Sequence, residues 1–382
     1  MARQQGRTRG AAGRGKKATR QVGYAVVGLG HFAQDAVLPA FENAKDNSRL
    51  VALVSGDPEK SRELGERHGV PVFGYDRYEE CLALPEVEAV YIALPNSLHA
   101  EYAVKAARAG VHVLSEKPLA TSEAECREMI RACEENDVRL MTAYRLHFEQ
   151  ANLTAVEAVR EGKIGDPRLF TSTFSFQIQA PNIRLERDKG GGVLWDIGVY
   201  CVNAARYLFR AEPVEVFAFC DRSDDERFTE TEEAASVVMR FPEGKLAAFN
   251  VSFGAEAVAT YRLVGTEGEL KLDNAYEYKG ELRWELTSQG KTRKGKVKER
   301  DQIAPELLTF SDCILEGTEP EPNGWEGLAD VRIISALYES ARTGQPVKLE
   351  PFEKPQRPTK EQELHRPPSE EAELVNVEAP TQ

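Results

Sequence analysis

The sequence lacks several features that mark other classes of protein. Its six cysteines are scattered and form no Cys-x-x-Cys pair, which favours reduced thiols over a disulfide framework or a zinc site. No segment approaches the roughly 20 apolar residues of a membrane-spanning helix. A net charge of -13 argues against general affinity for nucleic acid. With 382 residues, of which 41% are hydrophobic, the chain is long enough for two domains with sizeable cores.

Both ends of the chain differ in composition from its middle. Residues 1–20 contain seven basic and no acidic side chains without an apolar period, which predicts a disordered tail. This tail either solubilises the protein or acts as an arm that touches cofactor phosphates or a neighbouring subunit. Because it lacks the apolar stretch of a secretory signal, we expect a cytoplasmic protein. Residues 351–382 hold six prolines and seven glutamates and predict an extended, mobile tail.

Strands alternate with helices in residues 21–143. Helices are expected between the strands, and the one that starts at residue 58 should end at Gly69. This alternation predicts a parallel sheet with helices on both faces, an α/β domain of the Rossmann type. The expected strands cover 24–28, 50–54, 89–94, 111–115 and 138–143.

The pattern changes in residues 144–350, where short strands follow one another with few helices between them. This predicts an α+β domain with an open, mostly antiparallel sheet and helices on one face. The expected strands cover 168–179, 215–221, 234–241, 245–253, 261–265, 269–272 and 281–287, and the expected helices cover 152–161, 194–208, 306–316 and 325–343.

The first strand runs directly into the glycine turn Gly28-Leu29-Gly30-His31-Phe32-Ala33, which matches the pattern G-x-G-x-x-A. Gly28 allows a tight turn, Gly30 lets the backbone approach a pyrophosphate, and Ala33 permits close packing of helix on strand. The N–H groups at the start of the following helix favour phosphate. The turn therefore predicts a dinucleotide site that includes His31 and Phe32.

The end of the second strand distinguishes NADP from NAD. Ser55 occupies the position where NAD-binding proteins usually place a carboxylate for the ribose 2′-hydroxyl. Lys60 and Arg62 follow on the next helical turn and can reach a 2′-phosphate, so we expect NADP. Two alternatives remain: Lys60 and Arg62 form a solvated helix face, or Asp57 turns inward and serves NAD.

Two more loops are expected at the carboxyl edge of the parallel sheet, which faces the cofactor. One carries Leu94 and Asn96, with Asn96 either beside the nicotinamide or serving only the turn. His99 follows as either a packing residue or a site residue. The other loop carries Glu116-Lys117-Pro118. Lys117 can donate a hydrogen bond to a substrate hydroxyl and stabilise a neighbouring anion.

Asp196 and Tyr200 follow a triple glycine and share one face of the next expected helix. Removal of a hydride from a carbinol leaves a proton, which a tyrosine can accept if a cation lowers its pKa. Lys117 is the expected cation, and Asp196 either orients it or relays the proton. The alternative is structural, with Asp196 near a helix N-cap and Tyr200 in a core.

Glu116-Lys117-Pro118 and the pair Asp196 and Tyr200 resemble the Gfo/Idh/MocA family of oxidoreductases, and within it the glucose–fructose oxidoreductase branch. The resemblance covers about residues 21–350. It implies that Lys117 and Tyr200 are catalytic and that Ser55 and Lys60 serve NADP. It also implies that Tyr144 and Arg145 lie near the nicotinamide and the sugar, and that Arg184 contacts the sugar.

The resemblance further implies oxidation of an aldose at C1 to a lactone with NADP, or the reverse reaction on a ketose. The substrate would be a sugar or polyol, and the free face of the second sheet would be buried in a homodimer or homotetramer. Alternatives are a dihydrodiol or deoxysugar dehydrogenase, a non-catalytic NADP-binding regulator, and tails that dock a partner. Nucleic acid, membrane and metal are not expected to bind.

Overall fold

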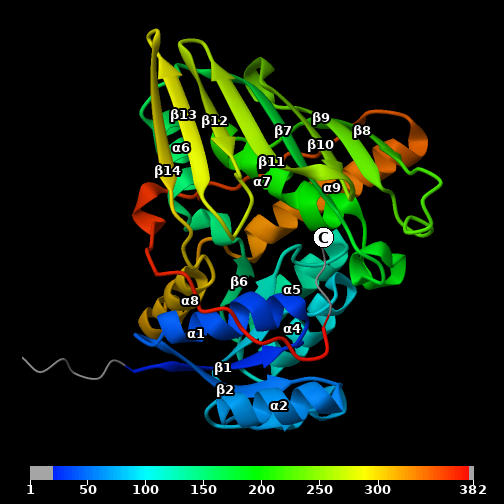
Figure 1. Ribbon diagram of the computed structural model, residues 1–382, viewed down its shortest axis with the longest axis vertical. Helices are drawn as coiled ribbons and strands as arrows, with labels where there is room; N and C mark the ends of the chain where they lie inside the picture. Colours follow the sequence, from blue (N-terminus) through cyan, green and yellow to red (C-terminus); the bar gives the residue numbers. More distant parts are fainter. Residues whose placement is uncertain (1–19, 378–382) are drawn as a thin grey trace, which may run out of the picture.

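Two sheets organise the computed structural model, which describes residues 20–377 (Figure 1). The predicted basic tail therefore lies outside the described residues except for Arg20. The first sheet is parallel, with strand order β3-β2-β1-β4-β5-β6. Its strands are β1 (Val22–Val27), β2 (Ser48–Val54), β3 (Val72–Phe73), β4 (Ala89–Ile92), β5 (His112–Glu116) and β6 (Leu140–Ala143).

Helices cover both faces of this sheet, as the alternation of strands and helices predicts. One apolar cluster joins the sheet to α4 and α5, and another joins it to α1 and α8. The helices of this part are α1 (Leu38–Asn43), α2 (Pro58–His68), α3 (Tyr78–Leu82), α4 (His99–Arg108) and α5 (Glu123–Glu135). Gly69 ends α2 with a φ of 66°, and Ser122 caps α5 by accepting the N–H of Glu125.

The second sheet has the order β14-β13-β12-β11-β7-β10-β9-β8-β15. Only β7 and β10 pair in parallel, so the sheet is mostly antiparallel, as expected. Its strands are β7 (Pro167–Gln177), β8 (Glu215–Asp221), β9 (Ala234–Arg240), β10 (Leu246–Ser252), β11 (Gly254–Gly265), β12 (Gly268–Asp273), β13 (Leu282–Ser288), β14 (Lys291–Val297) and β15 (Val347–Lys348). The sequence reading missed β14, because its residues are almost all polar and lack the apolar alternation of a half-buried strand.

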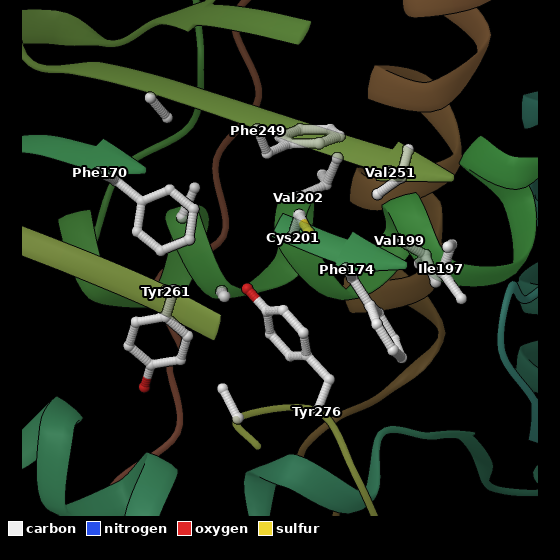
Figure 2. Packing of buried hydrophobic residues seen from close by; sticks show 14 of the residues in the cluster. Phe170, Phe174, Ile197, Val199, Cys201, Val202, Phe249, Val251, Tyr261 and Tyr276 are labelled. Atoms are coloured by element: carbon white, nitrogen blue, oxygen red, sulfur yellow. The ribbon is translucent and has the colours of Figure 1, made fainter. Parts of the chain in front are cut away.

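One face of the second sheet carries the core of this domain. Phe170, Phe174, Phe249 and Tyr261 project from the strands into the same apolar cluster as Cys201 and Val202 (Figure 2). The covering helices are α6 (Gln150–Arg160), α7 (Val199–Phe209) and α9 (Gly324–Thr343). In β9 and β10 burial alternates residue by residue, so the opposite face stays exposed.

Helix α8 (Ala304–Glu316) follows the second sheet in the chain but packs on the first. The hydroxyl groups of Tyr24 in β1 and Ser311 in α8 lie 2.8 Å apart, within the buried interface. This return of the chain joins the two domains and brings α8 to the cavity described below. No helix among the described residues is both long enough and apolar enough to cross a membrane.

Residues 351–377 differ from the mobile tail that their composition predicts. They are extended, with a single 3₁₀ turn at Lys360–Gln362, but they lie along both domains (Figure 1, red). Lys354 is 6% exposed and donates to Glu321 at 2.6 Å, while Arg357 donates to Glu212 at 2.6 Å. Composition alone misses these contacts because buried carboxylates far away in the sequence supply the partners.

Candidate active site

A cavity of about 1200 Å³ lies where the carboxyl edge of the first sheet meets the second domain. Most of the residues that the sequence marks as site residues line it. From the first domain and the loop after β6 these are Gly30, His31, Phe32, Leu94, Asn96, Glu116, Lys117 and Arg145. From the second domain they are Arg184, Asp196 and Tyr200.

The glycine turn fits a dinucleotide phosphate. Gly28 has a φ of 93°, and a Cβ there would lie 2.5 Å from the carbonyl oxygen of Ala93, so the turn requires glycine. At Gly30 a Cβ would meet no atom within 4 Å, and this residue lines the cavity. A ligand can therefore approach the backbone of Gly30 directly, which is the arrangement that a pyrophosphate needs.

The segment after β2 is arranged around Asp57. Its Oδ1 accepts the N–H groups of Glu59 at 2.9 Å and Lys60 at 3.1 Å, which caps α2. Its Oδ2 accepts a hydrogen bond from the Asn376 side chain at 2.6 Å. Both oxygens are thus engaged, which argues against the alternative in which Asp57 turns inward. Ser55 is 5% exposed, and its hydroxyl accepts the N–H of Asp57 at 3.2 Å.

Neither Ser55 nor Lys60 lines the cavity as the structure stands. Ser55 lies at the end of β2 and Lys60 in the first turn of α2. Arg62 forms an ion pair with Glu63 at 2.9 Å on the exposed side of α2, as the solvated-face alternative expects. Contact of Ser55 and Lys60 with a 2′-phosphate stays a prediction.

Asp196 joins two cations at the centre of the cavity wall. Lys117 Nζ donates to the carbonyl oxygen of Asp196 at 3.0 Å and to its Oδ1 at 3.2 Å, and Arg184 Nε donates to its Oδ2 at 2.8 Å. Burial raises the pKa of the Asp196 carboxyl, but Arg184 and Lys117 outweigh burial, so the net pKa is lowered. A carboxylate that stays ionised orients Lys117 better than it relays a proton.

Tyr200 lies between two cations. Lys117 Nζ is 4.8 Å from the centre of its ring, and Arg145 Nη2 donates to its hydroxyl at 3.3 Å. Arg145 is held in turn by Gln302 and by the carbonyl group of Tyr276. Burial lowers the pKa of Lys117, but the neighbouring Tyr200, Asp196 and Glu116 outweigh burial. The net pKa is therefore raised, and Lys117 stays protonated. Two positive charges thus lie against Tyr200 on the cavity wall.

Two further carboxyl groups, those of Glu116 and Glu306, line the cavity, and the sequence reading found only Glu116. Glu116 accepts the hydroxyl of Tyr91 at 2.6 Å and the N–H of Lys117 at 3.2 Å. Glu306, in α8, has no hydrogen-bond partner for either oxygen among residues 20–377. Burial, and after it the Glu116 carboxylate, raises the pKa of Glu306 well above its usual value. A glutamate within the run Ile303-Ala304-Pro305-Glu306-Leu307-Leu308 was the signal that could have revealed it.

Besides Gly28, Ser55 and Lys60, two further predicted site residues do not line the cavity. His99 is fully buried, and its ring nitrogens lie 2.9 Å from the carbonyl oxygens of Leu94 and Pro118. It thus connects the loops that carry Leu94 and Lys117 instead of contacting a ligand. Tyr144 is 4% exposed and donates its hydroxyl to Asp330 at 2.5 Å. The expected contact of Tyr144 with nicotinamide and sugar is therefore replaced by a bond to a buried carboxylate.

Asn96 connects the two domains at the cavity. Its side-chain amide donates to the carbonyl oxygen of Gly190 at 2.8 Å, and it also lines the wall. Gly190 begins the triple glycine, and a Cβ there would lie 2.8 Å from that of Asn96. The glycine segment thus allows the close approach that places Asp196 opposite Lys117.

Comparisons with known proteins identify the family of the chain. A family model described as "Oxidoreductase family, NAD-binding Rossmann fold" matches residues 22–144, and one described as "GFO/IDH/MocA C-terminal domain" matches residues 152–271. D-xylose 1-dehydrogenase (NADP(+)) 2 of Haloferax volcanii is 32% identical, over 86% of this chain and 99% of its own. 

Two solved structures of oxidoreductases are similar to this chain in sequence and fold. The aldose-aldose oxidoreductase of Caulobacter crescentus, solved with glycerol, is 38% identical with a TM-score of 0.82, over 86% of this chain and 100% of its own. The 3-ketoreductase KijD10 of Actinomadura kijaniata, solved with NADP and TDP-benzene, is 26% identical with a TM-score of 0.76, over 84% and 98% of the two chains.

A dinucleotide turn and a lysine–tyrosine pair on one cavity wall define a nicotinamide-dependent oxidoreductase that acts on CH–OH groups. The chain belongs to the Gfo/Idh/MocA family of such enzymes. The predicted fold class is confirmed, with a Rossmann domain followed by a domain built on a mostly antiparallel sheet. The cofactor is of the NAD(P) type.

Proposed function

We propose that the protein transfers a hydride between NADP and a sugar, oxidising an aldose at C1 to its lactone or reducing a ketose in the reverse direction. The observation that carries this proposal is the position of Tyr200 between Lys117 and Arg145 on the wall of the cavity that Gly30 also lines. The names of the xylose dehydrogenase and the aldose-aldose oxidoreductase support a sugar as the substrate.

The proposed roles follow from which groups face the cavity. When bound, the nicotinamide supplies the acceptor for the hydride that leaves C1. The Tyr200 oxygen takes the proton of the C1 hydroxyl, and Lys117 donates a hydrogen bond to the same hydroxyl oxygen. Asp196 holds Lys117 in place through two hydrogen bonds, and Arg184 holds Asp196 from the other side. Arg145 stabilises the phenolate before it receives the proton.

NADP is proposed over NAD for a local reason. Asp57, the carboxylate nearest the position that would hold a ribose 2′-hydroxyl, already accepts three hydrogen bonds. Ser55, directly after β2, carries no charge that would repel a 2′-phosphate, and Lys60 supplies a positive charge in the first turn of α2. The NADP that the xylose dehydrogenase is named for agrees with this choice.

A second candidate is a reductase of deoxysugars carried on a nucleotide. The similarity to KijD10, solved with a nucleotide analogue, favours it. Both candidates use the same proton-transfer residues and differ only in what fills the outer part of the cavity.

The test begins with protein purified without added cofactor and then denatured, so that mass spectrometry identifies any released nucleotide. Formation of NADPH is next measured with a panel of free aldoses, and consumption of NADPH with ketoses and nucleotide-linked ketosugars. Turnover of free aldoses with NADP supports the first candidate, and turnover confined to nucleotide-linked sugars supports the second. Release of NAD, or turnover with NAD alone, would contradict the roles proposed for Ser55 and Lys60.

The exposed face of the second sheet supports a homodimer. Leu169, Phe219, Val238 and Leu246 are 47%, 66%, 49% and 42% exposed on neighbouring strands, and contiguous apolar patches of this kind mark protein interfaces. We expect Phe219→Glu to convert a dimer to a monomer in light scattering after size exclusion. The control is Arg262→Glu, at a polar position on β11; a monomeric unmodified protein would contradict this interface.

A further inference from the structure

The last described residues of the chain lie on the dinucleotide side of the cavity. Asn376 and Val377 line its wall together with Gly30, His31 and Phe32. Because Gly30 and Asn376 both border the open volume, the segment forms a wall of the site and does not fill it.

A side chain that follows the glycine turn holds this segment. Gln34 Oε1 accepts the N–H of Val375 at 2.7 Å, and Gln34 Nε2 donates to the carbonyl oxygens of Val375 and Leu29, each at 3.0 Å. Gln34 is 1% exposed and Val375 4%, and the Val375 side chain belongs to the apolar cluster of α1 and α8. The buried glutamine therefore satisfies both backbone groups of one tail residue, as a neighbouring strand would.

The segment has a second anchor at the end of β2. Asn376 donates to Asp57 Oδ2 at 2.6 Å, and the carboxylate of Glu373 lies 3.6 Å from Arg67 in the last turn of α2. The tail thus spans from the helix after β1 to the loop after β2. In a Rossmann domain the pyrophosphate and the adenosine ribose lie between these two segments.

We propose that residues 371–377 belong to the cofactor site as a strap over the adenosine half of NADP, and that they slow its release. This inference rests on the proposed function, since it takes the dinucleotide as the ligand. Release of the cofactor past this wall requires the Val375 pair with Gln34 and the Asn376 bond to Asp57 to open first. Asn376 also keeps Asp57 turned toward the tail and away from the ribose.

The test compares the full-length protein with three variants by stopped flow, following release of bound NADPH by its fluorescence during a chase with excess NADP. Deletion of residues 370–382 should speed release by about tenfold or more, because the strap and its hydrogen bonds are lost together. Deletion of residues 378–382 is the matched control and should leave the rate unchanged. Asn376→Ala removes one hydrogen bond without shortening the chain and should speed release by about threefold.

If the longer truncation and Asn376→Ala both release NADPH at the rate of the unmodified protein, the proposal of a strap is wrong, while the proposed function is unaffected. So would slower release, or tighter binding of NADPH after truncation, because the tail would then compete with the cofactor for its site. If the full-length protein binds no NADPH at all, the proposed function fails and the strap fails with it. A melting temperature measured for each form separates loss of the strap from loss of the fold.

Discussion

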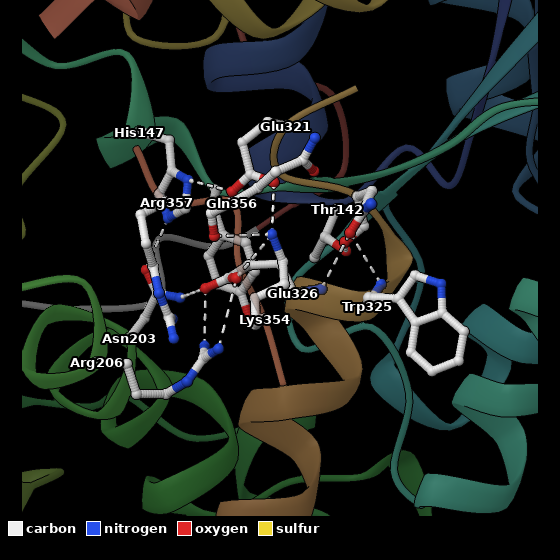
Figure 3. A network of polar contacts seen from close by, with 12 residues as sticks. Thr142, His147, Asn203, Arg206, Glu321, Trp325, Glu326, Lys354, Gln356 and Arg357 are labelled. Atoms are coloured by element: carbon white, nitrogen blue, oxygen red, sulfur yellow. Dashed lines mark hydrogen bonds and ion pairs between the residues drawn. The ribbon is translucent and has the colours of Figure 1, made fainter. Parts of the chain in front are cut away.

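Two clusters of buried charge in this protein use the same residue types for different ends. At the cavity, Asp196 joins Lys117 and Arg184, and Tyr200 lies against Lys117 and Arg145. Between the domains, Arg206 bonds to Glu212 at 2.7 Å, Glu326 at 2.8 Å and Asp330 at 2.6 Å. Lys354 from the tail pairs with the same Glu326, and Figure 3 shows Arg206 and Lys354 on either side of this carboxylate.

The two clusters differ in their access to the cavity. The open cluster lines it and consists of Lys117, Arg145, Arg184, Asp196 and Tyr200, whereas the closed cluster around Arg206 does not. The Arg206 side chain is 0% exposed, and each of its three nitrogens donates to a carboxylate. Lys117 has three donors, but its hydrogen bonds to described residues all go to Asp196, and it lines the cavity. A charged group whose hydrogen-bond donors are all paired within the protein stabilises the fold, whereas one with an unpaired donor on the cavity can bind a ligand.

The largest expected effect tests the open cluster. Lys117→Ala should lower kcat by about 10²–10⁴-fold, because it removes the hydrogen bond to the substrate hydroxyl and a cation beside Tyr200. Its unfolding free energy should change far less. Steady-state kinetics with the substrate that the panel of sugars identifies measures the loss. Lys105→Ala, on the surface of α4, is the control. Near-normal turnover of the Lys117 variant would rule out the proposed mechanism.

Arg206→Ala tests the closed cluster. It leaves Asp330 buried without its Arg206 partner and Glu326 with only the ion pair to Lys354, so the unfolding free energy should fall by about 3–5 kcal/mol. Chemical denaturation measures it. Arg240→Ala breaks an ion pair in which Arg240 is 65% exposed and should cost less than about 1 kcal/mol. Equal losses in the two variants would show that burial does not distinguish these charges.

His147 makes the closed cluster sensitive to acid. Burial lowers its pKa to about 4, from 6.5 in the unfolded chain, despite the opposing effect of Glu326. The folded state therefore disfavours the proton, so this contribution is complete above pH 6.5 and is lost as the pH falls toward 4. It amounts to about 3 kcal/mol. Denaturation from pH 4 to 7 should show a steeper fall for the unmodified protein than for His147→Gln, and parallel curves would contradict this.

The smallest expected effect tests the role of Arg184 in the open cluster. Arg184→Gln removes one of the two cations that hold Asp196 and leaves the Lys117 contact intact. We expect kcat/KM to fall by about tenfold, with most of the change in KM if Arg184 also binds sugar. A fall as large as that of Lys117→Ala would mean that Arg184, and not Lys117, dominates the site.

Sequence reading reached most of the cavity because its residues follow local rules. The glycine turn, the loop with Glu116 and Lys117, and the spacing of Asp196 and Tyr200 each belong to one short segment. Parallel strands bring the glycine turn and the loop with Glu116 and Lys117 to a common edge, so the meeting of these two could be expected. Glu306 escaped because it lies in a helix that only the tertiary structure returns to the first sheet.

Neighbouring residues show where sequence alone stops. Arg145 faces the cavity while Tyr144, one position earlier, bonds to Asp330 in the buried network. The tail has the composition of a mobile segment, yet Val375 and Asn376 find partners in Gln34 and Asp57. Local sequence thus determined the elements, the turn and the chemistry of the edge loops. Which charges are buried in the closed cluster and which face the cavity was decided only by packing, because it depends on segments that are far apart in the sequence.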